Sequence, residues 1–246
     1  MAITATRTSA LGEASAGRVV SIHQPAYLPW LGYFDKIRRA DRFVYLDTVQ
    51  FQKQSFQNRN KIRTADGWTW LTVPVETKGV LYETPLKDLR INNRVDWRRK
   101  HLRAIEMHYR KAPRFAEIMP LMESFLGRDW DRLADLCFDM LTAFNRLLGI
   151  ETEVLRASAL SGVEGGKSDL ILNLCRHLGA TQYLSGTLGR NYLDEAAFEA
   201  AGIALRYQDY THPVHAQAYD GFEPYMGVID LLMNEPDPAG VIEGRA

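Results

Sequence analysis

The sequence predicts an α/β fold: one three-layer domain with a mainly parallel, Rossmann-like sheet of the type that binds nucleotides. Short β-branched runs alternate with helical segments near both ends of the chain, whereas only helical spacing follows between residues 96 and 148. The 246 residues are 46% hydrophobic, which is enough to bury a large core. We therefore expect a single domain at 18–234 with a helical insert at about 96–148, between a disordered tail at 1–17 and a C-terminal tail at 235–246.

A βαβ unit opens the domain. Residues 18–22 form a β-branched run that stops at His23, apolar residues recur at helical spacing over 30–37, and residues 43–46 form a second apolar strand. A strand, a helix and a strand this close together predict two parallel neighbouring strands.

The middle of the chain predicts a polar loop, a hairpin and helices. Residues 47–61 are dense in Gln and Asn and have no helical stripe, so they form a loop or an edge segment. The Asp66-Gly67 pair between alternating apolar positions predicts a β-hairpin insert. Helical spacing covers 96–109 and 129–148, and Gly149 is a C-cap candidate.

Strand and helix alternate again in the last third. Strands are predicted at 152–158, 181–186 and 203–208, and helices at 165–179 and 193–202, each helix ending at a glycine. A terminal amphipathic helix at 225–234 is expected to dock on the core.

Composition excludes several classes of protein. Thirty basic residues balance thirty acidic ones, so general nucleic-acid binding is not expected. Cys137 and Cys175 lie in helical patterns without metal-ligand spacing, and no metal site is predicted. No apolar run suits a signal peptide or a membrane span, which predicts a cytoplasmic protein without membrane insertion.

Two further groups of charged or titratable residues have ordinary interpretations. His212 and His215 flank Pro213, which prevents a helical metal pair and favours a surface turn. The basic segment 90–114 spreads its cations around a helix, as on a solvated face, although a rim for phosphate, an acidic substrate or RNA also fits.

Two residues at strand ends are the candidate catalytic groups. His23 ends the first strand and Asp47 the second, so parallel neighbouring strands would place the two side chains side by side. A carboxylate can orient an imidazole and raise its basicity, which predicts His23 as a general base. Alternatively, Asp47 caps the following turn.

Candidate substrate-binding residues follow the strand ends, where ligands bind in open α/β sheets. Aromatic and amide side chains suit a polar ring-containing ligand, and arginines in glycine-rich loops or a helix start suit an anion. Each group also has a structural interpretation. The aromatic residues would pack in the core, the amide-rich loop would be a solvated edge strand, Ser168 would be an N-cap, and the loop after Ser185 would be a glycine-rich turn. The candidates are Gln24, Tyr27, Trp30, Tyr33, Gln50, Gln54, Asn58, Arg59, Asn60, Lys61, Lys167, Ser185, Thr187, Arg190 and Tyr192.

Several segments together resemble the WbqC-like family of bacterial proteins: residues 20–37, 40–62, 179–186, 189–195 and 222–235. The similarity runs from about Val19 to Asn234. It implies an enzyme of surface-polysaccharide (O-antigen, lipopolysaccharide) or natural-product biosynthesis, transferring an acyl or aminoacyl group, such as glycyl, to an amine of a nucleotide-linked amino sugar or similar polar metabolite. The donor would be a thioester, an enzyme-formed adenylate or an aminoacyl-tRNA.

Two alternatives stay open. Nucleotidyltransferases of the HxGH type are similar in having a turn after the first strand and a later Ser/Thr–Arg loop, represented here by residues 30–33 and 185–190. Trp30 and Tyr33 replace both of their histidines, and only this ligase or nucleotidyltransferase alternative requires ATP and Mg²⁺. A non-catalytic polar-ligand-binding protein is the other alternative.

Overall fold

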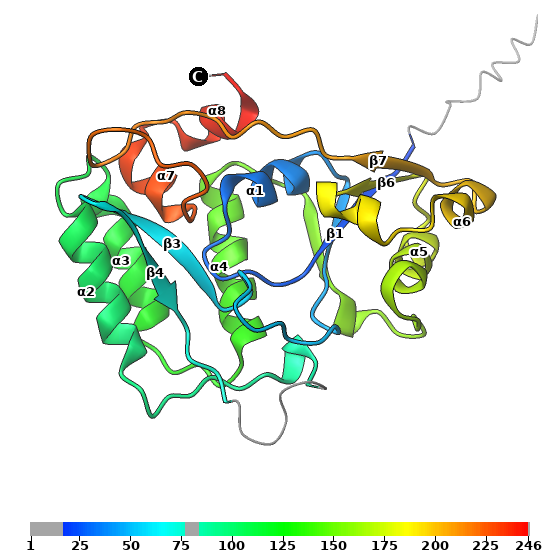
Figure 1. The fold of residues 1–246 in the computed structure, drawn as a ribbon, viewed down its shortest axis with the longest axis horizontal. Coiled ribbons are helices and arrows are strands. Elements are labelled where there is room, and N and C mark those ends of the chain that lie inside the picture. The colour runs from blue at the N-terminus through cyan, green and yellow to red at the C-terminus, as the bar shows by residue number, and fades with distance from the viewer. Residues whose placement is uncertain (1–16, 77–83, 246) are drawn as a thin grey trace, which may run out of the picture.

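A computed structural model describes residues 17–76 and 84–245. It confirms the three-layer α/β fold (Figure 1). The predicted disordered tail lies outside the described residues except for Gly17. Five parallel strands form the sheet in the order β5 (Glu153–Arg156), β2 (Arg42–Tyr45), β1 (Val19–His23), β6 (Gln182–Ser185) and β7 (Ala204–Tyr207).

Strand β1 is at the centre of the sheet. Its Ser21 is paired with Phe43 of β2 on one side and with Leu184 of β6 on the other. Consecutive strands are added outward from β1 through β2 to β5 in one direction, and then through β6 to β7 in the other. The strand order therefore reverses between β1 and β6, and ligands bind beyond the carboxyl ends of strands at such a reversal.

Alternating side chains give the sheet two apolar faces. Val20 and Ile22 pack in one core with α5 (Lys167–His177) and α6 (Glu195–Ala200). Phe43 and Tyr45 of β2 point into the other core with α1 (Leu31–Arg38) and α4 (Leu133–Leu147). A strand presents successive residues to opposite faces, so β2 contributes Val44 to the first core and Phe43 and Tyr45 to the second.

The chain between β2 and β5 contains the hairpin and helical inserts. Strands β3 (Arg59–Thr64) and β4 (Gly67–Thr72) pair antiparallel around the predicted Asp66-Gly67 turn. A short 3₁₀ helix, η1 (Leu86–Asp88), then leads to α2 (Trp97–Tyr109) and α3 (Phe115–Leu126) beside the hairpin, at the opposite end of the molecule from α5 and α6 (Figure 1).

Helix α3 was not predicted from the sequence. Pro120 lies inside it and removes a backbone donor, which ordinarily argues against a helix. Ile118, Met122 and other apolar side chains of α3 are nevertheless buried, and the helix contacts α2 and α7 (Ile229–Asn234). Burial of this face offsets the missing hydrogen bond.

The C-terminal tail expected at 235–246 instead contains a helix. Helix α8 (Pro238–Glu243) begins at Asp237, whose carboxylate accepts the backbone N–H of Gly240. Val241 and Ile242 are buried, and α8 contacts α1. The docked terminal helix predicted at 225–234 is shorter than expected, since α7 begins only at Ile229. No helix in the described part of the chain is long and apolar enough to cross a membrane.

Candidate functional site

Three segments distant in sequence form a groove beside the carboxyl end of β1. Trp30 precedes α1, and Tyr225 belongs to the segment before α7. Phe56 lies just before β3 of the hairpin, and Lys61 lies within β3. These four residues line a space of about 290 Å³. Trp30 and Lys61 were predicted to bind substrate, whereas Phe56 and Tyr225 were not.

Backbone hydrogen bonds join these three segments. Tyr27 N donates to Phe56 O at 3.1 Å, and Gly227 N donates to Lys61 O at 2.9 Å. A Cβ atom on Gly227 would lie 3.0 Å from Leu28 O and 3.2 Å from Lys61 O. Only glycine therefore permits this close approach without displacing the backbone.

Three predicted substrate-binding residues are instead structural. Asn58 Nδ2 donates to Val73 O at 2.8 Å, and Asn60 Nδ2 donates to Leu28 O at 2.5 Å. Tyr27 is fully buried, with its hydroxyl 2.9 Å from His101 Nδ1. Their polar groups satisfy buried partners that hold the groove's segments together.

The imidazole of His23 lies next to the groove. Its ring contacts the rings of Trp30 and Tyr33, with centroids 5.6 and 4.7 Å away. Nδ1 is 3.0 Å from the carbonyl oxygen of Gln24, so Nδ1 carries the proton and Nε2 is the unprotonated nitrogen. Within the described residues, Nε2 has no hydrogen-bond partner.

Burial, and secondarily the charge of Lys36, lowers the pKa of His23 to about 3. The imidazole is therefore neutral at physiological pH. A neutral ring with one unoccupied nitrogen is the form that can accept a proton from a substrate.

Lys36 is a component of this site that sequence reasoning missed. Its side chain is almost completely buried, and Nζ donates to Ile22 O at 2.9 Å. Ile22 is the residue before His23 in β1. Burial lowers the pKa of the ammonium group to about 7. The available signal was a lysine between Phe34 and Ile37 on the buried face of α1.

Gln24, directly after β1, is fixed by two hydrogen bonds. Its side-chain oxygen accepts from Gln57 Nε2 at 2.6 Å, and its backbone carbonyl accepts from the Tyr33 hydroxyl at 3.0 Å. Tyr33 is buried, so it supports His23 and Gln24 and does not line the groove. The Nε2 group of Gln24 has no acceptor among the described residues and can donate to a ligand.

Asp47 does not contact His23. Its fully buried carboxylate accepts the backbone N–H of Ser158 at 2.9 Å and the Ser158 hydroxyl at 2.7 Å, in the 3₁₀ helix η2 (Ala157–Ala159). The predicted catalytic pair is therefore absent from this structure, and Asp47 has a capping role toward the segment after β5.

The glycine-rich loop after β6 forms a separate group. Ser185 is buried and donates to Gly186 O, whereas Thr187, Arg190 and Tyr192 are exposed at and beyond the 3₁₀ helix η3 (Thr187–Asn191). The Arg190 guanidinium lies 4.0 Å from the centroid of the Tyr207 ring. None of these residues lines the groove of Trp30, Phe56, Lys61 and Tyr225.

The remaining predicted residues lie at the periphery. Gln50 and Gln54 are exposed, and Lys167 is exposed at the start of α5. Ser168 is not the N-cap of α5, because that position is Gly166 and the Ser168 hydroxyl accepts the N–H of Asp194 at 2.9 Å. No group of three or more His, Cys, Asp or Glu side chains within 17–76 and 84–245 has metal-binding geometry.

Comparison with known sequences shows the family to which this chain belongs. The sequence model of the WbqC-like protein family matches residues 24–241. The chain belongs to the WbqC-like family. It is 36% identical over 217 residues to Rv1507c, an uncharacterized protein of Mycobacterium tuberculosis, covering 87% of this chain and 93% of that protein. No solved structure matches the chain.

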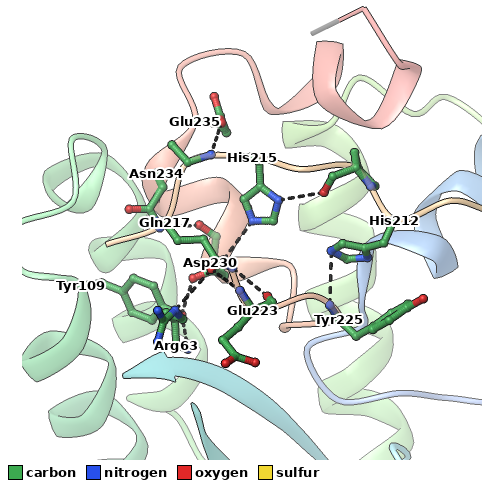
Figure 2. Close-up of polar contacts among 12 residues, drawn as sticks. Arg63, Tyr109, His212, His215, Gln217, Glu223, Tyr225, Asp230, Asn234 and Glu235 are labelled. Carbon is green, nitrogen blue, oxygen red and sulfur yellow. Dashed lines mark hydrogen bonds and ion pairs between the residues drawn. The ribbon is translucent and has the colours of Figure 1, made fainter. Parts of the chain in front are cut away.

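A second polar cluster in this WbqC-like protein is centred on a buried histidine–aspartate pair (Figure 2). His215 Nε2 lies 2.9 Å from Asp230 Oδ2, and both side chains are only 1% exposed. Asp230 also accepts from the Tyr109 hydroxyl at 3.0 Å and from Gln217 Nε2 at 2.8 Å. The surface turn predicted for His215 is therefore wrong: this histidine is buried against Asp230 of α7, and Asp230 in turn connects α7 to Tyr109 of the helical insert.

His212 connects this segment to the groove of the WbqC-like protein (Figure 2). Its Nε2 accepts the backbone N–H of Tyr225 at 3.3 Å, and its Nδ1 lies 3.1 Å from the Tyr210 hydroxyl. Tyr225 has a left-handed φ of 61°, which is costly for a residue with a Cβ. Burial lowers the pKa of His212 to about 4, which keeps Nε2 available as an acceptor.

Proposed function

We propose that this protein transfers an acyl or aminoacyl group, such as glycyl, to an amine of a nucleotide-linked amino sugar or a similar polar metabolite in surface-polysaccharide or natural-product biosynthesis. The observation that carries the proposal is the unprotonated Nε2 of His23, unpartnered in the described structure, beside a groove with aromatic and cationic walls. Family membership is consistent with this proposal but does not identify the reaction.

In the proposed step, the acceptor amine attacks the carbonyl carbon of the donor while His23 Nε2 takes one of its protons. The new C–N bond forms as the bond between that carbon and the donor's sulfur or oxygen breaks. The leaving group departs with the electron pair and receives the proton from His23. Because the pKa of His23 is about 3, Nε2 takes the proton only as the C–N bond forms and the amine nitrogen becomes acidic, and the buried imidazolium then gives the proton up readily.

Trp30 and Tyr33 hold the imidazole through ring contacts, and the Gln24 carbonyl fixes its tautomer. The Nε2 donors of Gln24 are available for the acceptor's hydroxyl or carbonyl oxygens. The proposal also keeps the predicted binding roles of Gln50, Gln54, Lys167, Thr187 and Tyr192, which lie outside the groove.

The test is an acyl-transfer assay with aminoacyl-tRNA or acyl thioester donors and nucleotide-linked amino sugars, followed by mass spectrometry. A well-placed general base contributes about 10²- to 10⁴-fold, so His23→Gln should lower turnover by that factor without changing the melting temperature. His177→Gln, at an exposed histidine of α5, is the matched control and should retain full activity. Near wild-type turnover in His23→Gln would remove His23 from the mechanism.

Nucleotidyl transfer is the second candidate, because exposed Arg190 follows β6 at the reversal of strand order. It predicts release of pyrophosphate from ATP or CTP in the presence of Mg²⁺, which acyl transfer from a thioester does not produce. Tight ligand binding without turnover of any donor would instead favour the non-catalytic alternative.

A further inference from the structure

A chain of aromatic rings extends from His23 to the hairpin turn. Trp30 contacts Phe56 at a centroid distance of 5.6 Å, Phe56 contacts Trp70 at 5.8 Å, and Trp70 contacts Trp68 at 5.4 Å. Phe56 is 40% exposed and Tyr225 is 49% exposed, although both are large aromatic residues. The groove therefore presents ring surface to solvent, and such surface stacks well on planar ligands.

The charge beside these rings is positive. Lys61 Nζ lies 4.1 Å from the centroid of the Trp68 ring, and the Arg59 guanidinium lies 4.3 Å from that of Trp70. Within the described structure Lys61 has no ion pair, and Arg59 Nε is a buried donor with no hydrogen-bond partner. No carboxylate lines the groove. This combination favours an anion and disfavours the quaternary ammonium ligands that aromatic cages bind.

The size of the groove limits what it can hold. Its volume of about 290 Å³ is just below the roughly 300–1,000 Å³ typical of ligand pockets. One planar ring system fits this space, whereas a complete nucleotide-linked sugar would have to extend beyond it.

We propose that the groove of Trp30, Phe56, Lys61 and Tyr225 is the nucleobase subsite of a nucleotide ligand, with the base stacked on the aromatic walls and a phosphate close to Lys61 or Arg59. This inference rests on the proposed function in one respect: that function makes the nucleotide a part of the acceptor substrate. It places the nucleotide at the hairpin side of β1 and away from the glycine-rich loop that ends in Arg190.

The position of Tyr225 in the groove depends on contacts of its backbone with other segments. Its strained backbone is held by the hydrogen bond to His212 and by the bridge that pairs neighbouring Gly227 with Trp30. We expect His212 to act as a positioning residue, which holds the ring of Tyr225 over the groove without touching the ligand.

Isothermal titration with the nucleoside diphosphates UDP, GDP and ADP tests the subsite without requiring any turnover. At least one should bind the full-length protein, and pyrophosphate and glucose should bind at least tenfold more weakly. Tyr225→Ala should weaken binding roughly 5- to 150-fold, the range for loss of one stacking partner. Tyr225→Phe retains the ring and should stay within about threefold of wild type.

Two cations give a matched comparison. Lys61→Ala should weaken diphosphate binding about 10-fold or more, whereas Arg190→Ala should change it less than twofold. His212→Phe should weaken nucleotide binding while leaving the small affinity for pyrophosphate unchanged, which general loss of folding would not do. Melting temperatures identify any variant that fails to fold.

The inference is overturned if no diphosphate binds, if binding is unaffected by both Tyr225→Ala and Lys61→Ala, or if binding is lost in Arg190→Ala alone. Pyrophosphate binding as tight as that of the diphosphates would also overturn it, since the site would then recognise only the anion. All of these results are measurements of binding, whereas the proposed acyl transfer is tested by the turnover of His23→Gln. Failure of the subsite and failure of the proposed acyl transfer are therefore distinguishable.

Discussion

His23 and His215 lie in two polar clusters of the same chain and differ in how their nitrogens are used. His23 has one nitrogen on the Gln24 carbonyl and the other without a partner in the described structure. His215 has Nε2 at 2.9 Å from Asp230 and Nδ1 at 3.4 Å from Pro213 O, and its side chain is 1% exposed. Residue type does not distinguish a candidate base from a structural histidine, whereas unoccupied polar atoms beside accessible space do.

The two clusters also differ in how they tolerate charge. Both carboxylate oxygens of Asp230 are hydrogen-bonded, as a buried ionised group requires. Lys36 near His23 has only the Ile22 carbonyl as a hydrogen-bond partner in the described structure, and burial lowers the pKa of its ammonium group to about 7. The Asp230 cluster is thus expected to stabilise the fold, and the Lys36 ammonium to destabilise it.

The largest effect is expected from Asp230→Ala. It leaves His215, Tyr109 and Gln217 without their shared acceptor, and removal of one partner from a buried pair costs about 3–5 kcal/mol. Urea denaturation at pH 7 measures the loss. Asp209→Ala, at an exposed position, should stay within about 0.5 kcal/mol. A loss below about 1 kcal/mol for Asp230→Ala would show that the buried cluster does not stabilise the fold.

Lys36→Met should have the opposite sign and stabilise the protein by roughly 1–4 kcal/mol at pH 7, because it removes a buried charge at the expense of one hydrogen bond. Burial lowers the pKa of Lys36 from 10.5 to about 7, so the unfolded chain holds more protons between these values. Stability of the wild type should therefore rise with pH across this window, and the Lys36 contribution to that rise should vanish in the variant. Equal pH dependence in both proteins would contradict this prediction.

The same variant sharpens the description of His23. Removal of the ammonium should raise the pKa of His23 above its value of about 3, although burial should keep it below 6.5. NMR titration of the histidine ring protons measures this shift. His177, exposed on α5, should titrate identically in both proteins.

Gly227→Ala should cost about 1–3 kcal/mol, because the new methyl group crowds Leu28 O and Lys61 O where the groove's segments meet. It should also weaken diphosphate binding, since Lys61 and Tyr225 would move apart. Gly186→Ala is the control, because a Cβ there meets no atom within 4 Å. Equal stability of the two variants in thermal unfolding would disprove the close approach.

Arg190→Ala should have only a small effect on stability, below about 1 kcal/mol, because its contact with Tyr207 is an exposed cation–π interaction. Chemical denaturation measures it against the wild type. A loss above about 2 kcal/mol would show that the glycine-rich loop depends on this arginine more than the contact explains.

Local patterns in the sequence determined most of the secondary structure. The predicted strands formed the parallel sheet, Asp66-Gly67 became a hairpin turn, and Gly149, Gly179 and Gly202 end helices with φ of 63°, 65° and 70°. These features depend on backbone preferences and side-chain periodicity within a few residues, so no tertiary contact is needed to predict them. The position of His23 at the end of β1 follows from the same local signal.

Tertiary structure decided which polar atoms are occupied. The Asp47 carboxylate accepts a hydrogen bond from Ser158 and does not contact His23 at the end of the adjacent strand. The buried imidazole of His215 contacts the carboxylate of Asp230. Phe56 and Tyr225 become walls of one groove only because Gly227 contacts the hairpin. Each of these contacts joins residues brought together by the folded path of the chain. Local periodicity specifies the face on which a side chain lies, but not the side chain from another segment that it meets there.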